Sequence, residues 1–151
     1  MKIRRATLKD LKDIQQLNNE LFELELANFD QYLIKNWPLS DDGEKYFTGA
    51  INNDFVVVAE TNNHVVGYLL GEKCDIPYYN FDVAELCNMC VNSNYRKCGI
   101  GAKLYSAFEE YYNSQGITHF VVTASFKNES AKAFYKKMGF EEANTTLCKF
   151  K

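Results

Sequence analysis

The chain has 151 residues, of which 46% are hydrophobic and 15% aromatic, enough to bury the core of one ordinary domain. Its 17 basic and 20 acidic residues give a formal net charge of −3, without the basic field that nucleic-acid binding needs. No apolar run is long enough to cross a bilayer, and no signal-peptide pattern follows Met1. We expect a single domain over residues 1–151, in the cytoplasm, with neither nucleic acid nor membrane as a partner.

The first part of the chain predicts a strand and two helices. Lys2 to Ala6 has the pattern of a short strand, and Thr7 with Asp10 forms a capping box for a helix. The apolar stripe of this helix is Leu11, Ile14, Leu17, Leu21 and Leu24. Because proline disfavours helical geometry in the residue before it, the helix must end before Trp37-Pro38. A second helix begins near Ser40 or the next residue.

The middle of the chain predicts three strands. Phe55 to Glu60 and Val65 to Leu70, joined by Asn62-Asn63, have the pattern of an antiparallel hairpin. Val83 to Val91 is the third strand.

The last third predicts a helix, a strand and a second helix. Apolar residues at helical spacing begin at Ile100, and Gly116 ends that helix. Phe120 to Ala124 is a buried strand, Ala131 to Met138 form a helix that Gly139 closes, and the remaining residues form one or two short strands. This order of elements predicts a mixed α/β (α+β) sandwich.

The five cysteines are an odd number, which fits free thiols in a reducing compartment. Several of them lie in apolar, strand-like runs, where a thiol behaves as a small hydrophobe. Cys87 and Cys90 have a Cys-x-x-Cys spacing, but an extended strand would direct them to opposite faces. No second Cys or His pair follows, so we expect no metal site.

The turn from Arg96 to Gly101 carries the clearest chemical signal. It joins a strand ending at Val91 to a helix, and such a turn presents backbone N–H groups and a positive helix end to phosphate oxygens. Gly99 and Gly101 permit close approach of a pyrophosphate, and Arg96 and Lys97 add positive charge. The alternative is a solvated turn without a ligand. The nucleoside-triphosphate and dinucleotide loop patterns are not satisfied.

These residues resemble the GNAT superfamily of acetyltransferases, whose cofactor loop reads Arg/Gln-x-x-Gly-x-Gly/Ala. The matching segments are Ala84-Glu85-Leu86, Met89-Cys90-Val91, Asn94-Tyr95-Arg96, Gly99-Ile100-Gly101, Asn128, Ala133-Phe134-Tyr135 and Gly139-Phe140. The resemblance implies a mostly antiparallel sheet with a splayed central strand pair, flanked by about four helices. It also implies an acyltransferase that moves an acetyl group from acetyl-CoA to a primary amine by direct attack in a ternary complex.

The resemblance further implies how acetyl-CoA binds. Backbone groups of Met89 to Val91 would bond the pantetheine arm like an added strand, and the turn would hold the pyrophosphate. A bulge would splay this strand from Phe120–Ala124 and admit the thioester. The implied cofactor-binding residues are Met89, Cys90, Val91, Arg96, Lys97, Cys98, Gly99, Ile100, Gly101, Ala102, Asn128 and Ala131.

Acetyl transfer to an amine needs two proton movements. Tyr135 matches the family's general acid, although its helical stripe is equally typical of core packing. Glu85 is the candidate base, because strand parity places it on the face of Val83, Cys87, Met89 and Val91. A glutamate at this position is the base in the histone-acetylating branch of the family. A water relay is the alternative, and a bulge would reverse the facing of Glu85.

In relatives the acceptor pocket involves the two N-terminal helices and their connection. The candidates here are the Asp75 to Asp82 loop, with Tyr78 and Tyr79, and the connection Phe29 to Lys45, which includes Tyr32 and Trp37. The acidic and aromatic side chains of this connection suit a cationic amine. Its acidic members Asp41, Asp42 and Glu44 are also typical of a helix start. Few residues follow Phe140, so we expect an open pocket or one that a homodimer completes. We expect a small-molecule acceptor; the alternatives are protein N-termini or lysines, or a non-catalytic CoA-binding module.

Overall fold

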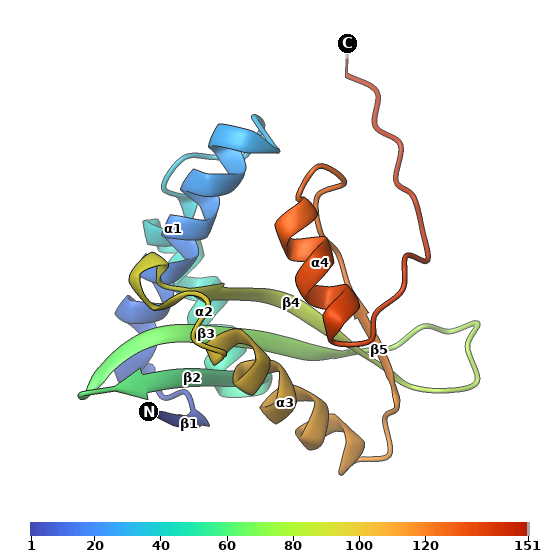
Figure 1. Ribbon diagram of the computed structural model, residues 1–151, viewed down its shortest axis with the longest axis horizontal. Coiled ribbons are helices and arrows are strands. Elements are labelled where there is room, and N and C mark those ends of the chain that lie inside the picture. Colours follow the sequence, from blue (N-terminus) through green and yellow to red (C-terminus); the bar gives the residue numbers. More distant parts are fainter. Residues whose placement is uncertain (151) are drawn as a thin grey trace.

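Five strands form one sheet in the order β1-β2-β3-β4-β5, with helices on both faces (Figure 1). The computed structural model describes residues 1–150. The strands are β1 (Lys2–Arg5), β2 (Phe55–Thr61), β3 (His64–Cys74), β4 (Val83–Val91) and β5 (His119–Val122). The helices are α1 (Leu11–Asn28), α2 (Asp41–Asn53), α3 (Ile100–Asn113) and α4 (Glu129–Lys137), with short 3-10 turns η1 (Leu8–Asp10), η2 (Trp37–Leu39) and η3 (Ser93–Tyr95). Neighbouring strands are antiparallel except β4 and β5, which are parallel.

The sheet is buried on both faces, which explains the unbroken apolar run of β2. Phe55, Val57 and Ala59 belong to the core beneath α3, whereas Val56 and Val58 belong to the core beneath α1 and α2. Because side chains alternate along a strand, a sheet covered on both sides needs apolar residues at every position. The predicted mixed α/β sandwich and the predicted hairpin are confirmed.

The start of α1 depends on a buried carboxylate. The backbone N–H of Thr7 donates to Asp10 Oδ2 at 2.8 Å, as the capping-box pattern predicts. Two guanidinium nitrogens of Arg4 also bond Asp10, each at 2.9 Å, and Arg4 Nε donates to Glu60 at 2.7 Å. Asp10 is 5% exposed. This network therefore ties β1 to both the first turn of α1 and β2.

Replacing Asp10 by Asn is expected to destabilise the fold by about 2–4 kcal/mol at pH 7, because it leaves a partly buried Arg4 short of one partner. Arg4 holds the pKa of Asp10 below its usual range. A depressed pKa contributes stability above the unfolded-state value and loses it as the pH falls through the folded-state value. Urea unfolding at pH 7 and pH 3 checks this: the difference from wild type should shrink at pH 3, and an equal difference would contradict the network.

The parallel pair β4 and β5 separates after a short paired segment. Val83 to Leu86 pair with His119 to Val122, and β5 ends there while β4 continues to Val91. In the β3–β4 ladder Leu70 faces Asn88 and Gly71 faces Leu86. Cys87 is therefore an extra residue, a β-bulge, at the point of separation. The expected splayed strand pair is present.

The bulge corrects two expectations about side-chain facing. Cys87 and Cys90 both pack against the core beneath α1 and α2, not on opposite faces. Met89 packs against the core beneath α3. Ala84 also belongs to that α3 core, so Glu85, its neighbour in the strand, lies on the opposite face from Met89. The alternation of side-chain facing along β4 did not hold past Cys87, because the extra residue reverses which face the later side chains take.

The one or two short strands predicted at the C-terminal end do not form within residues 141–150. Residues 141–150 have no regular secondary structure and are exposed. Most of them are polar, and Leu147 remains 91% exposed, so the segment has no apolar face to bury against β5. The ring of Phe150 instead stacks on Tyr32, with centroids 4.2 Å apart, and brings the tail beside the connection between α1 and α2.

Candidate active site

A cleft of about 480 Å³ lies where β4 and β5 separate. Its floor is formed by residues 86–89 of β4 and residues 122–125 at the end of β5. One wall is α1 and the other is α4, which stand side by side in Figure 1. Trp37 of η2 and Tyr46 of α2 close one side. The separation of β4 and β5 thus opens the sheet and forms the cleft.

Each wall is one face of a helix. The α1 wall consists of Asn18, Leu21, Phe22 and Glu25, at spacings of three and four residues. The α4 wall consists of Asn128, Ala131 and Tyr135, at spacings of three and four residues. Such spacings place side chains above one another on the same side of a helix. Tyr135 and Ala131, which the sequence pattern identified, therefore both line the cleft.

Tyr135 both packs in the core and lines the cleft. Its ring packs against the core beneath α3 and lies 5.4 Å from the ring of Phe134 and 5.7 Å from that of Phe140. It also lines the cleft. Burial raises the pKa of Tyr135 to about 12. Its hydroxyl therefore keeps its proton at neutral pH, as a general acid must before it acts.

The turn before α3 has the backbone of an anion site. Lys97 has φ of 62° and Gly99 has φ of 76°, and this left-handed geometry turns successive N–H groups to one side. The first intrahelical bond runs from Lys103 N–H to the Gly99 carbonyl at 3.2 Å. The N–H groups of residues 100–102 therefore have no acceptor within the helix. Arg96 Nε donates to the Val91 carbonyl at 2.9 Å and fixes the turn to the end of β4. Cys98 is exposed in the same turn.

The end of β4 offers an unpaired edge. Met89, Cys90 and Val91 pair with residues of β3 on one side. On the other side β5 pairs only with Val83 to Leu86. Among residues 1–150 no strand pairs with this edge of Met89 to Val91, and Met89 lines the cleft. The Val91 carbonyl accepts from Arg96, and the other backbone groups of the edge remain available for an extended ligand.

Asn128 connects the two walls of the cleft. Its Oδ1 caps α4 by accepting from Ala131 N–H at 3.0 Å. Its Nδ2 donates to Glu25 Oε1 on α1 at 3.3 Å. Asn128 thus both begins α4 and holds a carboxylate at the cleft.

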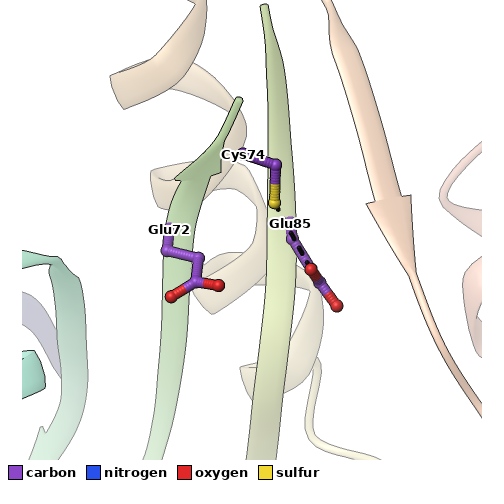
Figure 2. Close-up of side chains that lie close together, drawn as sticks. All are labelled: Glu72, Cys74 and Glu85. Carbon is purple, nitrogen blue, oxygen red and sulfur yellow. Dashed lines mark hydrogen bonds between the residues drawn. The ribbon is translucent and has the colours of Figure 1, made fainter. Parts of the chain in front are cut away.

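Glu85 does not line the cleft. It lies two residues before Cys87, which does, and it forms a group with Glu72 and Cys74 whose polar atoms are within 4.8 Å of one another (Figure 2). Cys74 Sγ donates to Glu85 Oε2 at 3.3 Å. Desolvation and the neighbouring Glu85 raise the pKa of the Cys74 thiol to about 11. The protonated Cys74 thiol thus donates to Glu85 and holds its carboxylate beside Glu72.

The expected acceptor acids lie elsewhere. Asp41, Asp42 and Glu44 occupy the first turn of α2, whose N-cap Ser40 accepts from Gly43 N–H at 3.2 Å. Asp41 and Glu44 border a separate surface hollow. Their helix-start role therefore accounts for them, and only Trp37 of the expected aromatic residues lines the cleft.

The carboxylates that do line the cleft are Asp30, inside the expected Phe29–Lys45 connection, and Glu25, which sequence reasoning missed. Glu25 lies seven positions after Asn18, so both polar residues border the apolar stripe of α1 on one side. The seven-residue spacing of these two polar residues is the sequence signal that could have identified Glu25 as a cleft residue. No lysine, arginine or histidine is among the described residues that line this cleft.

Comparisons with known proteins agree on one family. The model of the acetyltransferase (GNAT) family matches residues 11–140. An uncharacterized N-acetyltransferase of Methanocaldococcus jannaschii is 28% identical over 153 residues. The match covers 93% of this chain and 60% of that protein, so this chain spans less than two thirds of that relative's length.

Solved structures share the fold. A tetramutant of the BH1408 protein of Bacillus halodurans superposes with a TM-score of 0.88 at 21% identity, over 97% of both chains. An aminoglycoside acetyltransferase from an uncultured soil metagenomic sample, solved in complex with sisomicin, has a TM-score of 0.73 at 26% identity. That match covers 99% of this chain and 96% of the other. None of the described helices is long and apolar enough to span a membrane.

Proposed function

Because this chain belongs to the acetyltransferase (GNAT) family, we propose that it transfers the acetyl group of acetyl-CoA to a primary amine of a small molecule. The observation that carries the proposal is the position of Tyr135, in a cleft that opens where β4 and β5 separate. The family makes the chain an acyltransferase, and the site geometry supports the donor and the acceptor class.

Two features of the structure fit acetyl-CoA. The N–H groups of residues 100–102 and the left-handed Gly99 suit the pyrophosphate, and no atom lies within 4 Å of where a Cβ at Gly99 would be. The free edge of Met89 to Val91 suits the amide groups of the pantetheine arm. Asn128 and Ala131 line the same cleft. Acetyl-CoA supplies the reactive thioester.

The protein's residues then manage the protons. The acceptor ammonium loses one proton and its nitrogen attacks the thioester carbonyl. The carbon–sulfur bond breaks, and the nitrogen loses its second proton to solvent as the amide forms. Tyr135 donates its hydroxyl proton to the departing thiolate and regains a proton from solvent. Glu85, two residues from the cleft-lining Cys87, would take the ammonium proton through a water relay.

The pH dependence of turnover tests the role of Tyr135. With a pKa of about 12, the acid stays protonated as the pH rises, whereas the acceptor amine becomes more nucleophilic. We therefore expect kcat to rise with pH and to show no descending limb up to about pH 10. A descending limb at lower pH, in protein shown by circular dichroism to remain folded, would contradict this assignment.

The acceptor class is tested by release of free CoA thiol with a panel of polyamines, amino sugars, amino acids and peptides. We expect kcat/KM to be higher for one or more small amines than for any peptide. Higher values for peptides would favour modification of protein N-termini or lysines. Binding of acetyl-CoA without amine-dependent release would favour a non-catalytic CoA-binding module.

A further inference from the structure

The mouth of the cleft carries negative charge without a cation to balance it. Glu25 of α1 lines the cleft and accepts from Asn128 Nδ2 at 3.3 Å. Asp30 lines the same cleft, and among the described lining residues neither carboxylate meets a lysine, arginine or histidine. A ligand that fills this space therefore meets two acceptors for positive charge.

The surroundings of Glu25 strengthen its attraction for a cation. Burial raises the pKa of Glu25, with a smaller contribution from Asp30, while the Asn128 hydrogen bond opposes the rise. A half-buried carboxylate has lost part of its hydration, which an ammonium group would replace. The stacked rings of Phe22 and Trp37, with centroids 5.9 Å apart, line the same cleft and present π-faces that favour cations.

Glu25 and Tyr135 lie at opposite ends of the cleft. Asn128, which holds Glu25, precedes Tyr135 by seven residues, or about 10 Å along a helix axis. On the other wall Asn18 precedes Glu25 by the same number, and Asn18 Nδ2 donates to the Tyr68 hydroxyl of the sheet at 2.7 Å. Figure 1 shows that the C-terminal end of α1 and the N-terminal end of α4 extend away from the sheet. Tyr135 is thus near the floor and Glu25 at the mouth.

We propose that Glu25 determines acceptor specificity by binding a second ammonium group, about 10 Å from the amine that is acetylated, so that the preferred acceptor is a small diamine or polyamine. This inference rests on the proposed function, because the reacting amine is placed by the roles of Tyr135 and acetyl-CoA. Asn128 positions the Glu25 carboxylate across the mouth.

The test compares 1,8-diaminooctane, whose extended chain separates its nitrogens by about 11 Å, with octylamine, which lacks the second charge. We expect the wild-type KM to be about tenfold lower for the diamine. In Glu25→Gln the ratio of the two KM values should fall to about one. Glutamine keeps an oxygen for Asn128, so the local fold is preserved. Glu23→Gln, an exposed change on the same helix, should keep the tenfold ratio.

A shorter diamine and a charge-reversal variant provide two further tests of the Glu25 site. The shorter 1,3-diaminopropane should gain no advantage over propylamine, and Glu25→Lys should make octylamine the better acceptor. If the wild type acetylates both eight-carbon amines with equal KM, the inference is wrong and the proposed function stands. If no amine is acetylated, but 1,8-diaminooctane raises the melting temperature of wild type and Glu23→Gln and not of Glu25→Gln, the proposed function is wrong and the Glu25 site stands.

Discussion

Tyr135→Phe is expected to lower kcat by about 10²- to 10⁴-fold, the usual contribution of a positioned general acid. The dissociation constant for acetyl-CoA should change little, because the phenyl ring keeps the packing of Tyr135 against Phe134 and Phe140. Loss of kcat with unchanged binding identifies an interaction made only in the transition state. Steady-state kinetics and calorimetric titration of acetyl-CoA measure the two quantities.

Tyr112→Phe is the matched control for that variant. Tyr112 is buried in the same core beneath α3, and burial raises its pKa as well, but it does not line the cleft. We expect this control to retain wild-type kcat. Wild-type kcat in Tyr135→Phe would instead assign Tyr135 to core packing alone.

Gly99→Asp is expected to abolish the rise in melting temperature that acetyl-CoA causes. At millimolar acetyl-CoA the wild type should melt several degrees higher, because the ligand binds the folded state. An added Cβ at Gly99 would meet no neighbouring atom within 4 Å, although the positive φ strains any side chain there. We expect most of the loss to come from placing a carboxylate beside the pyrophosphate. Thermal unfolding with and without acetyl-CoA measures it.

Two controls separate charge from backbone strain. Gly99→Asn has nearly the same shape without the charge, and asparagine tolerates the left-handed geometry, so part of the shift should remain. Gly116 has a similar φ of 80° and equally open surroundings after α3. Gly116→Asp should keep the full shift. Equal loss in all three variants would contradict a pyrophosphate site at Gly99.

Local signals predicted most elements of the fold. The Thr7–Asp10 box, the Ser40 cap and the Gly99 turn each depend on residues a few positions apart, and each is present as expected. The bulge at Cys87 depends instead on the register between β3 and β4. A single strand's sequence does not contain that register, so the facing of the Cys87–Val91 segment was wrong.

The residues of the candidate site likewise divide into those that a local motif predicts and those that depend on residues far apart in the sequence. Tyr135 and Asn128 were found because they stand in a recognisable motif, and both line the cleft. Glu25 contacts Asn128 across 103 positions of sequence, and no local pattern connects two such residues. Glu85 was identified by its motif, but it groups with Glu72 and Cys74 of β3 and is not among the described residues that line the cleft.

The most direct test of the account follows the acetyl group itself. The protein is incubated with acetyl-CoA that is deuterated in the acetyl methyl group and with each amine of the panel, and the products are analysed by mass spectrometry. We expect a labelled N-acetyl amine for at least one small amine, formed in equal amount with free CoA. Label found only in free acetate, or left in acetyl-CoA with every amine, would contradict it.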